Sequence, residues 1–447
     1  MFEDLSRVHF VGIGGIGMSA VAKWMLHKEI KVTGSDMHAS AITHDLALRG
    51  AKFFSGHSVE NLSEDVQLLV YSPAVPEDNI ERALARERGV RELSYPELLG
   101  EISKTFSTIV VTGTNGKSTT TAMLGLILEA AGYDPTVLVG SLVPGFKDGN
   151  LRMGKGRFFV VEGCEYKANM LHLEPEMIVL TNIEEDHLDF YRDLAHIQET
   201  FQSFVDKLKG QGMIVVNGDD EASKALNIMR PITYGADGAY KLISRRTEPG
   251  RQIVESNHGE LELQIPGAFN AHNALAALAA AMELGVPFET CARALKEFAG
   301  TWRRFERVGT WHGADIISDY AHHPTGVRET LKAAREFFPH RRILLCFQPH
   351  QHNRTKELFD GFVEALRGAD GLVVTEIYDV AGRNEDSDVS GNDLVEAIHK
   401  IDAAKDVRYA KDFASAKSEL RDMVKPGDVL IVMGAGDVDE VARELAN

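Results

Sequence analysis

The sequence predicts an α/β protein with parallel sheets, organised as about three domains. Short apolar runs alternate with helical patterns along nearly all of its 447 residues, and this alternation is typical of parallel strands joined by helices. The runs are apolar on both faces, as expected for strands of a sheet that is covered on both sides. A chain of this length corresponds to roughly three domains of about 150 residues each.

The predicted elements follow one another in a regular order. One segment, Tyr240 to Ile265, instead alternates polar and apolar residues around two turn sequences and is expected to form an antiparallel meander. Helical patterns are clearest at 119–131, 271–284 and 325–337. The expected strands are Val8–Ile13, Gln67–Tyr71, Thr108–Val111, Arg157–Val161, Met177–Thr181, Met213–Val216, Asp315–Ser318, Ile343–Phe347, Gly371–Glu376 and Val429–Met433. Expected boundaries near 103/104 and 301/302 give domains 1–103, 104–301 and 302–447.

Composition excludes several classes of function. The net charge is −18, which argues against nucleic acid or an anionic membrane as a partner, because both favour positive charge. The longest apolar stretch, Ala274 to Val286, contains Glu283 and is too short to span a bilayer. The cysteines Cys164, Cys291 and Cys346 are too few and too scattered for a disulfide framework. With no signal-like N-terminus, we expect a soluble cytoplasmic protein.

A first glycine-rich loop, Gly12 to Gly17, follows an apolar run and precedes a helical pattern. Its glycines would let backbone N–H groups approach a diphosphate at the start of the helix. Ser35 and Asp36 come at the end of the next short strand, where a ribose-binding acid is usual. Taken alone, the loop also fits a nicotinamide cofactor or a purely structural turn.

A second loop, Thr112-Gly113-Thr114-Asn115-Gly116-Lys117-Ser118-Thr119, lies between an apolar strand and a helix. Its backbone N–H groups would surround the β-phosphate of a nucleotide, and Lys117 would neutralise the β- and γ-phosphates. Ser118 or Thr119 would hold Mg²⁺. Val111 stands where a full Walker pattern has its first glycine, and a glycine turn with a solvated lysine is the alternative.

Two further strand ends carry acids and a histidine. Glu162 and Glu165 follow one predicted strand, and the acidic run 184–186 with His187 follows the next. Because ligands of open parallel sheets lie beyond the carboxyl ends of the strands, Glu162 and His187 are expected to converge near Lys117. Mg²⁺ favours oxygen ligands of this kind. A satisfied structural acid is the alternative for Glu162.

Taken together, the motifs resemble those of the Mur ligase family. They occur in the order HFVGIGGIGMSA, VYSPAV, TGTNGKSTTT, the Glu162 strand end, TNIEEDH, FNAHNALAALAA, WRRFE, DYAHHPT, FQPHQHNRT and GAGDVDE. The resemblance implies a Rossmann-like UDP-sugar domain, a central P-loop ATPase domain with a parallel sheet and the small meander, and a Rossmann-like C-terminal domain that binds an amino acid.

The resemblance also implies a reaction. ATP would convert the lactyl carboxylate of UDP-N-acetylmuramate into an acyl phosphate, which the amine of L-alanine attacks, in the synthesis of peptidoglycan precursors. The implied cofactors are ATP and Mg²⁺, and the implied protein is a monomer or weak homodimer. The alternative is a related ligase that attaches a preformed peptide to the same sugar during cell-wall recycling.

Site residues follow from the same resemblance. Catalytic roles fall on Lys117, Glu162, His187, Arg304 and Asp319. ATP binding falls on Gly113, Thr114, Asn115, Gly116, Lys117, Ser118, Thr119, Asn270, Asn273 and Arg304. Mg²⁺ binding falls on Ser118, Thr119, Glu162 and His187. UDP-sugar binding falls on Gly12, Gly14, Gly15, Ile16, Gly17, Ser35, Asp36, His57 and Ser72, and amino-acid binding on Tyr320, His322 and Arg354.

Two positions depart from the family pattern. Cys164 stands where relatives usually carry an acid, and Gln351 stands where those that add alanine usually carry arginine. The second change concerns the amino-acid substrate, because one guanidinium near its carboxylate is replaced. The histidines 322, 323, 350 and 352 also allow a zinc site, although neither cysteines nor carboxylates complete a clear tetrahedral set.

Overall fold

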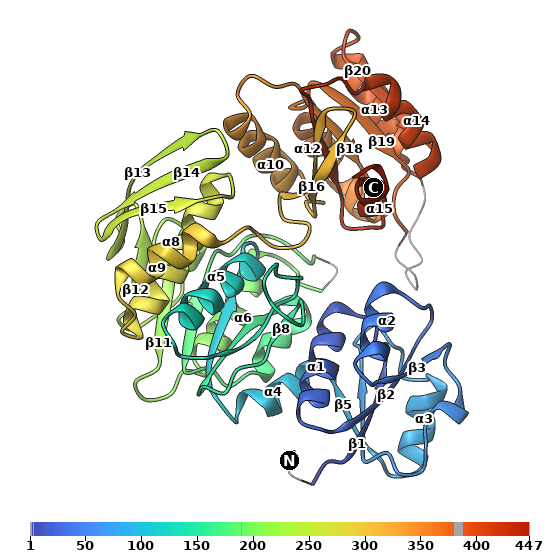
Figure 1. Cartoon of the computed structure of the whole chain (residues 1–447), viewed down its shortest axis with the longest axis vertical. Coiled ribbons are helices and arrows are strands. Elements are labelled where there is room, and N and C mark those ends of the chain that lie inside the picture. The colour runs from blue at the N-terminus through green and yellow to red at the C-terminus, as the bar shows by residue number, and fades with distance from the viewer. Residues whose placement is uncertain (1, 3, 189, 380–387, 447) are drawn as a thin grey trace. The chain divides into compact units, whose positions relative to one another are not determined.

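A computed structural model describes residues 2, 4–188, 190–379 and 388–446, and these form three sheets connected mostly by helices (Figure 1). The chain divides into two compact units. One contains residues 1–244, 255–261 and 272–296, and the other contains residues 245–254, 262–271 and 297–447. The predicted α/β class with three domains is confirmed, and each part is described below by itself.

The N-terminal sheet contains five parallel strands within the described residues, in the order β3-β2-β1-β4-β5. The strands are β1 (Arg7–Val11), β2 (Lys31–Asp36), β3 (Lys52–Ser55), β4 (Leu68–Tyr71) and β5 (Arg91–Ser94). The connecting helices are α1 (Ile16–His27), α2 (Ala41–Leu48), η1 (Val59–Asn61) and α3 (Ile80–Glu87), and α4 (Tyr95–Ser103) follows β5. The order reverses between β1 and β4, and in a Rossmann-like sheet ligands are expected to bind beyond the carboxyl ends of the strands at this point.

The central sheet places its most buried strands in the middle. Its order is β15-β14-β13-β12-β11-β10-β6-β9-β7-β8. The parallel strands are β6 (Ser107–Thr112), β7 (Thr136–Leu138), β9 (Phe158–Gly163), β10 (Met177–Leu180), β11 (Met213–Asn217) and β12 (Ile232–Gly235), while β8 (Leu151–Arg152) is antiparallel to β7. Its helices are α5 (Lys117–Ala130), η2 (Tyr166–His172), α6 (Leu194–Val205), α7 (Glu221–Lys224), α8 (Ala268–Glu283) and α9 (Phe288–Glu297).

The predicted meander forms the end of this sheet. It consists of β13 (Tyr240–Glu248), β14 (Arg251–Ser256) and β15 (Gly259–Leu263). Only two residues connect each strand to the next, and parallel strands need a much longer crossover, so consecutive strands run antiparallel.

The C-terminal sheet has the order β16-β17-β21-β18-β19-β20. Its strands are β16 (Glu306–Trp311), β17 (Ala314–Asp319), β18 (Ile343–Phe347), β19 (Gly371–Thr375), β20 (Asp406–Ala410) and β21 (Val429–Met433). Edge strand β16 is antiparallel to β17, and the others are parallel. The helices are α10 (Pro324–Phe337), α11 (His352–Glu357), α12 (Phe359–Leu366), α13 (Gly391–Ile401), α14 (Phe413–Met423) and α15 (Asp439–Ala446).

Burial of both faces explains why the ten predicted strands are found. Val110, Val160 and Val179, from three adjacent strands of the central sheet, are each 0% exposed. At roughly 25 cal/mol per Å² of apolar surface removed from water, such strands dominate the stability of the sheet. None of the helices in the described part of the chain is both long and apolar enough to cross a membrane.

Helix α1 is fastened to the segment that precedes β8. Asp148 is buried, and its backbone carbonyl accepts a hydrogen bond from Lys23 Nζ at 2.8 Å. Its carboxylate oxygen Oδ2 lies 2.7 Å from His27 Nε2. Asn150, also buried, donates from Nδ2 to the carbonyl of Ile16 at 2.5 Å. These contacts tie the helix after the first glycine loop to the central sheet.

Candidate active site

The second glycine loop connects β6 to α5, as predicted. Gly113 and Gly116 have φ angles of +134° and +86°. A Cβ on Gly113 would lie 2.1 Å from Thr181 Oγ1, and one on Gly116 would lie 2.3 Å from Asn273 Oδ1. Both positions therefore require glycine for conformation and for space, and the loop is fixed at the start of α5, where anions bind favourably.

The loop is also held from the neighbouring strand end. Thr114 N–H donates to the carbonyl of Asn182 at 2.9 Å, and Asn115 N–H donates to the side chain of the same residue at 2.9 Å. Thr181 Oγ1 donates to the carbonyl of Asn115 at 2.6 Å. The predicted nucleotide-binding residues Thr114 and Asn115 thus shape the loop through contacts with the segment that leads to His187.

Lys117, the first residue of α5, folds its side chain back over the loop. Its Nζ donates to the carbonyls of Gly113 and Thr114 at 2.6 and 2.9 Å, and it forms an ion pair with Glu165. Burial alone would lower the pKa of the Lys117 ammonium, but the charge of Glu165 and its hydrogen bond, together with the nearby Cys164 and Glu162, raise it. The lysine is therefore cationic at the position where the phosphates of a nucleotide are predicted to lie.

Glu162, at the carboxyl end of β9, lies beside the same helix start. Ser118 Oγ donates to Glu162 Oε2 at 3.1 Å, and the N–H of Gly140 donates to Oε1 at 2.5 Å. The predicted metal ligands Ser118 and Glu162 are thus adjacent in space. Thr119, the alternative hydroxyl, is buried in the first turn of α5 and is 7% exposed.

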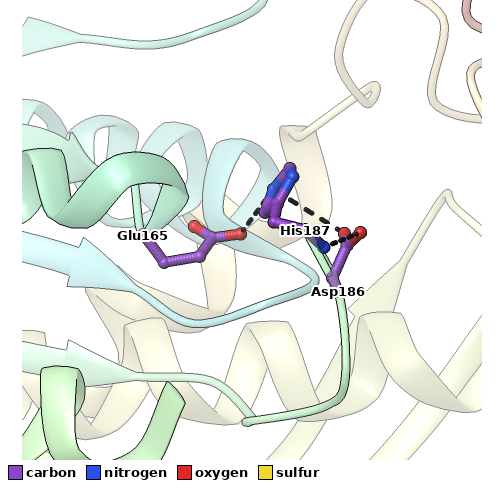
Figure 2. A group of neighbouring side chains, drawn as sticks. All are labelled: Glu165, Asp186 and His187. Carbon is purple, nitrogen blue, oxygen red and sulfur yellow. Dashed lines mark hydrogen bonds and ion pairs between the residues drawn. The ribbon is translucent and has the colours of Figure 1, made fainter. Parts of the chain in front are cut away.

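His187 is brought to this site through Glu165 and Asp186 (Figure 2). Its Nε2 lies 3.6 Å from Glu165 Oε1 and 3.8 Å from Asp186 Oδ2. Burial would raise the pKa of the Glu165 carboxyl, but the charge of Lys117 and a hydrogen bond from His187 lower it. Glu165 is therefore ionised and lies between the lysine and the histidine.

In the described residues, Glu165, Asp186 and His187 are the only group of three or more acids, histidines or cysteines close enough to share a metal ion. The histidines considered for zinc form no such group there. The sequence predicts Ser118, Thr119, Glu162 and His187 as metal ligands and has Glu165 beside Glu162 at the same strand end without naming it a ligand, whereas the structure brings Glu165 into this group. The sequence feature that points to Glu165 is its position two residues beyond the end of β9, at the same edge of the sheet as His187.

Helix α8 carries Asn270 and Asn273, two further residues that are predicted to bind the nucleotide. Asn273 lies against Gly116, while the neighbouring His272 Nε2 lies 3.1 Å from Asp219 Oδ2. Asn270 Nδ2 donates to the carbonyl of Pro266 at 2.7 Å. Asn273 thus meets the phosphate loop, whereas this hydrogen bond of Asn270 stays within the turn at the start of its own helix.

The first glycine loop also has the predicted strand–loop–helix setting. The N–H groups of Gly12 and Ile13 both donate to the carbonyl of Ser35, at 2.9 and 3.0 Å. The N–H of Gly14 donates to Asp36 Oδ2 at 2.8 Å. The Asp36 carboxylate therefore stabilises the loop through the N–H of Gly14.

The other glycines of this loop are packed closely. A Cβ on Gly12 would lie 3.0 Å from Ser72 Cβ, and one on Gly17 would lie 2.6 Å from the ring of Tyr95. Gly15 is the residue before α1, which begins at Ile16. The predicted Ser72 thus lies next to the loop at the carboxyl end of β4.

Ser35 and His57, both predicted to bind the sugar nucleotide, meet a buried acid that sequence reasoning missed. Ser35 Oγ donates to Glu81 Oε2 at 2.5 Å and lies 2.9 Å from His57 Nδ1. The Ser35 and Glu81 side chains are buried, and the His57 side chain is 16% exposed. Of the predicted pair, His57 is the more accessible side chain.

In the C-terminal domain, the Asp319 carboxylate accepts hydrogen bonds mainly from backbone N–H groups. Its two oxygens accept the N–H groups of Phe305 and Ala321 at 2.8 and 2.9 Å, and Thr330 Oγ1 donates to it at 3.3 Å. Burial raises the pKa of the Asp319 carboxyl despite these bonds. The acid shapes the chain at Phe305, whose φ is +50°, directly after Arg304.

The predicted amino-acid residues gather beside Arg304. The guanidinium carbon of Arg304 lies 5.0 Å from the centre of the Tyr320 ring, and the Tyr320 and His322 rings lie 5.3 Å apart. His350 lies 5.8 Å from His322, ring to ring, and its Nδ1 is 3.4 Å from Arg354 Nη1. The C-terminal domain thus places two guanidiniums, a phenol and two imidazoles at the carboxyl end of its sheet.

Three family models match the chain in order. The model described as "Mur ligase family, catalytic domain" matches residues 7–107, "Mur ligase middle domain" matches residues 111–281, and "Mur ligase, glutamate ligase domain" matches residues 303–436.

Ligases from several bacteria match nearly the whole chain. The UDP-N-acetylmuramate–L-alanine ligase of Lachnospira eligens is 38% identical over 458 residues, covering 99% of this chain and 98% of the relative. The crystal structure of UDP-N-acetylmuramate–alanine ligase from Thermotoga maritima is similar with a TM-score of 0.87 at 30% identity, covering 98% of both chains. A murein peptide ligase from Psychrobacter arcticus, with a TM-score of 0.71 at 22% identity over 98% of both chains, shares the fold. This chain belongs to the Mur ligase family.

Proposed function

We propose that this protein joins L-alanine to the lactyl carboxylate of UDP-N-acetylmuramate, with conversion of ATP to ADP and phosphate. The observation that carries the proposal is the loop Gly113–Ser118, with cationic Lys117 lying over it and Glu162 beside Ser118. The full-length likeness to ligases named for this reaction supports the choice of substrates.

The chemistry requires an electrophile that a free carboxylate does not provide. Transfer of the γ-phosphoryl group of ATP to the carboxylate oxygen forms an acyl phosphate and releases ADP. The neutral amine of alanine then attacks the acyl carbon, the amide bond forms, and phosphate leaves with the former carboxylate oxygen. Negative charge accumulates in both steps, so Lys117 and Arg304 are suited to stabilise it.

The oxygen-rich surroundings of the loop fit Mg²⁺. A hard cation prefers hydroxyl and carboxylate oxygens, which are offered here by Ser118 and Glu162. Glu165 and Asp186 offer further carboxylate oxygens in the group that also contains His187. Ser118 and Glu162 would hold the ion beside the phosphates, with Glu165 and His187 next to them. When bound, Mg²⁺ would supply positive charge to the phosphate oxygens.

The three domains would divide the substrates among them. The N-terminal domain, residues 1–103, would bind the UDP-sugar. The central domain, residues 104–301, would bind ATP, and residues 302–447 would bind the amino acid through Tyr320, His322 and Arg354. We further propose a monomer or weak homodimer that acts in the cytoplasm, where ATP and sugar nucleotides are available.

The test is nucleotide turnover with a panel of acceptors. ADP production is expected to rise only when UDP-N-acetylmuramate and L-alanine are both present with ATP and Mg²⁺. The variant Lys117→Met is the negative control, and Lys104→Met, which changes an exposed lysine, is the matched positive control. Greater turnover with a preformed tripeptide than with alanine would identify the recycling reaction instead. No stimulation by either acceptor would overturn the proposal.

A further inference from the structure

Glu81 is a buried acid that joins several parts of the N-terminal domain. It lies in the first turn of α3, and its side chain is 0% exposed. Its Oε1 accepts from Asn61 Nδ2 at 2.6 Å and from the N–H of Ser58 at 3.1 Å. Its Oε2 lies 2.5 Å from Ser35 Oγ and 3.3 Å from His9 Nε2. One carboxylate thus contacts the middle of β1, the end of β2 and the segment after β3.

The charge state of Glu81 follows from these contacts. Burial alone would raise the pKa of its carboxyl, but hydrogen bonds from His9, Ser35 and Asn61 lower the pKa to about 2. At neutral pH the group is an anion that accepts hydrogen bonds and donates none. Each neighbour of Glu81 must therefore point a proton toward it.

This requirement determines the tautomer of His57. Because the Ser35 hydroxyl gives its proton to Glu81, its oxygen can only accept from His57 Nδ1, which lies 2.9 Å away. Glu81 Oε2 itself lies 3.6 Å from the same Nδ1, and an anion there favours the same proton. A neutral His57 therefore carries its proton on Nδ1 and has a free lone pair on Nε2.

The Nε2 atom is available to a ligand. The structure records contacts of the His57 ring through Nδ1, and within the described residues none is recorded for Nε2. The Glu81 carboxylate also fixes the backbone next to the imidazole through the N–H of Ser58. The ring is thus oriented from two sides, and the His57 side chain is 16% exposed.

We propose that Glu81 is a positioning residue for the sugar-nucleotide site, which acts through Ser35 to hold His57 with Nδ1 protonated, so that Nε2 accepts a hydrogen bond from the UDP-sugar. This inference rests on the proposed function. The recognised group is a hydrogen-bond donor, either the imide N–H of uracil or a ribose hydroxyl. Ser35 then contributes to binding without touching the ligand.

The first test reads the tautomer directly, without substrate. Nitrogen–proton correlation spectra of the imidazoles, assigned with His57→Gln, are expected to place the proton of wild-type His57 on Nδ1. In Ser35→Ala, which removes the acceptor at 2.9 Å and leaves Glu81 Oε2 at 3.6 Å, the share of His57 with its proton on Nδ1 should fall and the share with it on Nε2 should rise. Glu87→Gln, a matched change at an exposed acid of the same helix, should leave the spectrum unchanged. A wild-type proton on Nε2 would overturn the proposal.

The second test measures binding and turnover. Ser35→Ala and Glu81→Gln should raise the KM for UDP-N-acetylmuramate about 10-fold, the effect of losing one well-placed hydrogen bond. The kcat and the KM for ATP should stay within about 2-fold, and Glu87→Gln should match wild type. If Glu81→Gln fails to fold, Ser35→Ala with its tautomer reading still decides the question. Equal KM values in Ser35→Ala and wild type would overturn the positioning role.

The recognised donor is identified with nucleotides alone. If it is the uracil N–H, CDP, whose ring lacks that proton, should bind wild type about 10-fold more weakly than UDP, and Ser35→Ala should remove the difference. If it is a ribose hydroxyl, 2′-deoxy-UDP should show this pattern instead. Wild-type protein that binds no UDP compound would overturn the proposed function together with this role. If wild type and Ser35→Ala both bind UDP, CDP and 2′-deoxy-UDP equally well, the positioning role is overturned and the proposed function is not.

Discussion

Lys117 and the buried Glu165 form an ion pair, with 2.8 Å between Nζ and Oε2. The lysine also donates to two carbonyls of its own loop, so its ammonium has protein partners before any nucleotide arrives. A phosphate that binds at the start of α5 would compete with these partners for the lysine. The pair therefore links the lysine predicted to neutralise phosphate to an acid beside the His187 imidazole.

Lys117→Met is expected to lower ATP turnover by about 10²- to 10³-fold, because a stabiliser of transition-state charge is lost. It also leaves the Glu165 charge buried without its partner, which costs roughly 3–5 kcal/mol of stability. The double variant Lys117→Met/Glu165→Gln should regain stability in urea unfolding but not turnover. Recovery of turnover in the double variant would show that the lysine matters only for folding.

Glu162→Gln is expected to raise the Mg²⁺ concentration for half-maximal rate by roughly 10- to 100-fold, because a charged oxygen ligand becomes neutral. The measurement is the rate at saturating ATP over a series of Mg²⁺ concentrations. Glu174→Gln, a change at a partly exposed acid paired with Lys207, is the control. An increase in Glu165→Gln but not in Glu162→Gln would place the metal on the Glu165–Asp186–His187 group instead.

Glu81 is expected to make stability depend on pH in the acid range. Its pKa falls from 4.5 to about 2 on folding, so its contribution is present above pH 4.5 and is lost as the pH falls toward 2. The contribution is roughly 3 kcal/mol at neutral pH. In urea unfolding, the difference between wild type and Glu81→Gln should shrink between pH 5 and 3. A difference that is constant over this range would contradict the low pKa.

Arg354→Met is expected to raise the KM for L-alanine by roughly 10- to 100-fold, because a charge-assisted hydrogen bond to a carboxylate is lost. The KM values for ATP and UDP-N-acetylmuramate should not change. Arg367→Met, at a surface arginine that pairs with Glu364, is the control in the same domain. An unchanged KM for alanine would exclude Arg354 from the amino-acid site.

The sequence was sufficient for the buried strands and insufficient for the edges of the sheets. Strands such as β6 and β18 are apolar on both faces, so their composition identifies them. Edge strands β3 and β20, with the sequences KFFS and DVRYA, are short and partly polar. Such segments become strands because a neighbour offers them hydrogen bonds, which local composition does not reveal.

Some residues of the candidate site could be predicted from the sequence and others could not. Lys117 and Ser118 were predicted because a glycine loop between strand and helix has a recognisable spacing. Glu81 was missed because IERALARE has the charged composition of an exposed helix, and its burial depends on contacts with distant β1 and β2. The domain limits at 103/104 and 301/302 stay predictions.

The fastening of α1 by Asp148 and Asn150 has a practical consequence for dissecting the enzyme. A fragment that stops at residue 103 would remove the Asp148 carbonyl from Lys23 and the Asp148 carboxylate from His27, and would open one side of α1 to water. Truncations that extend through β8 keep these partners and are the better starting point for expressing the N-terminal domain separately.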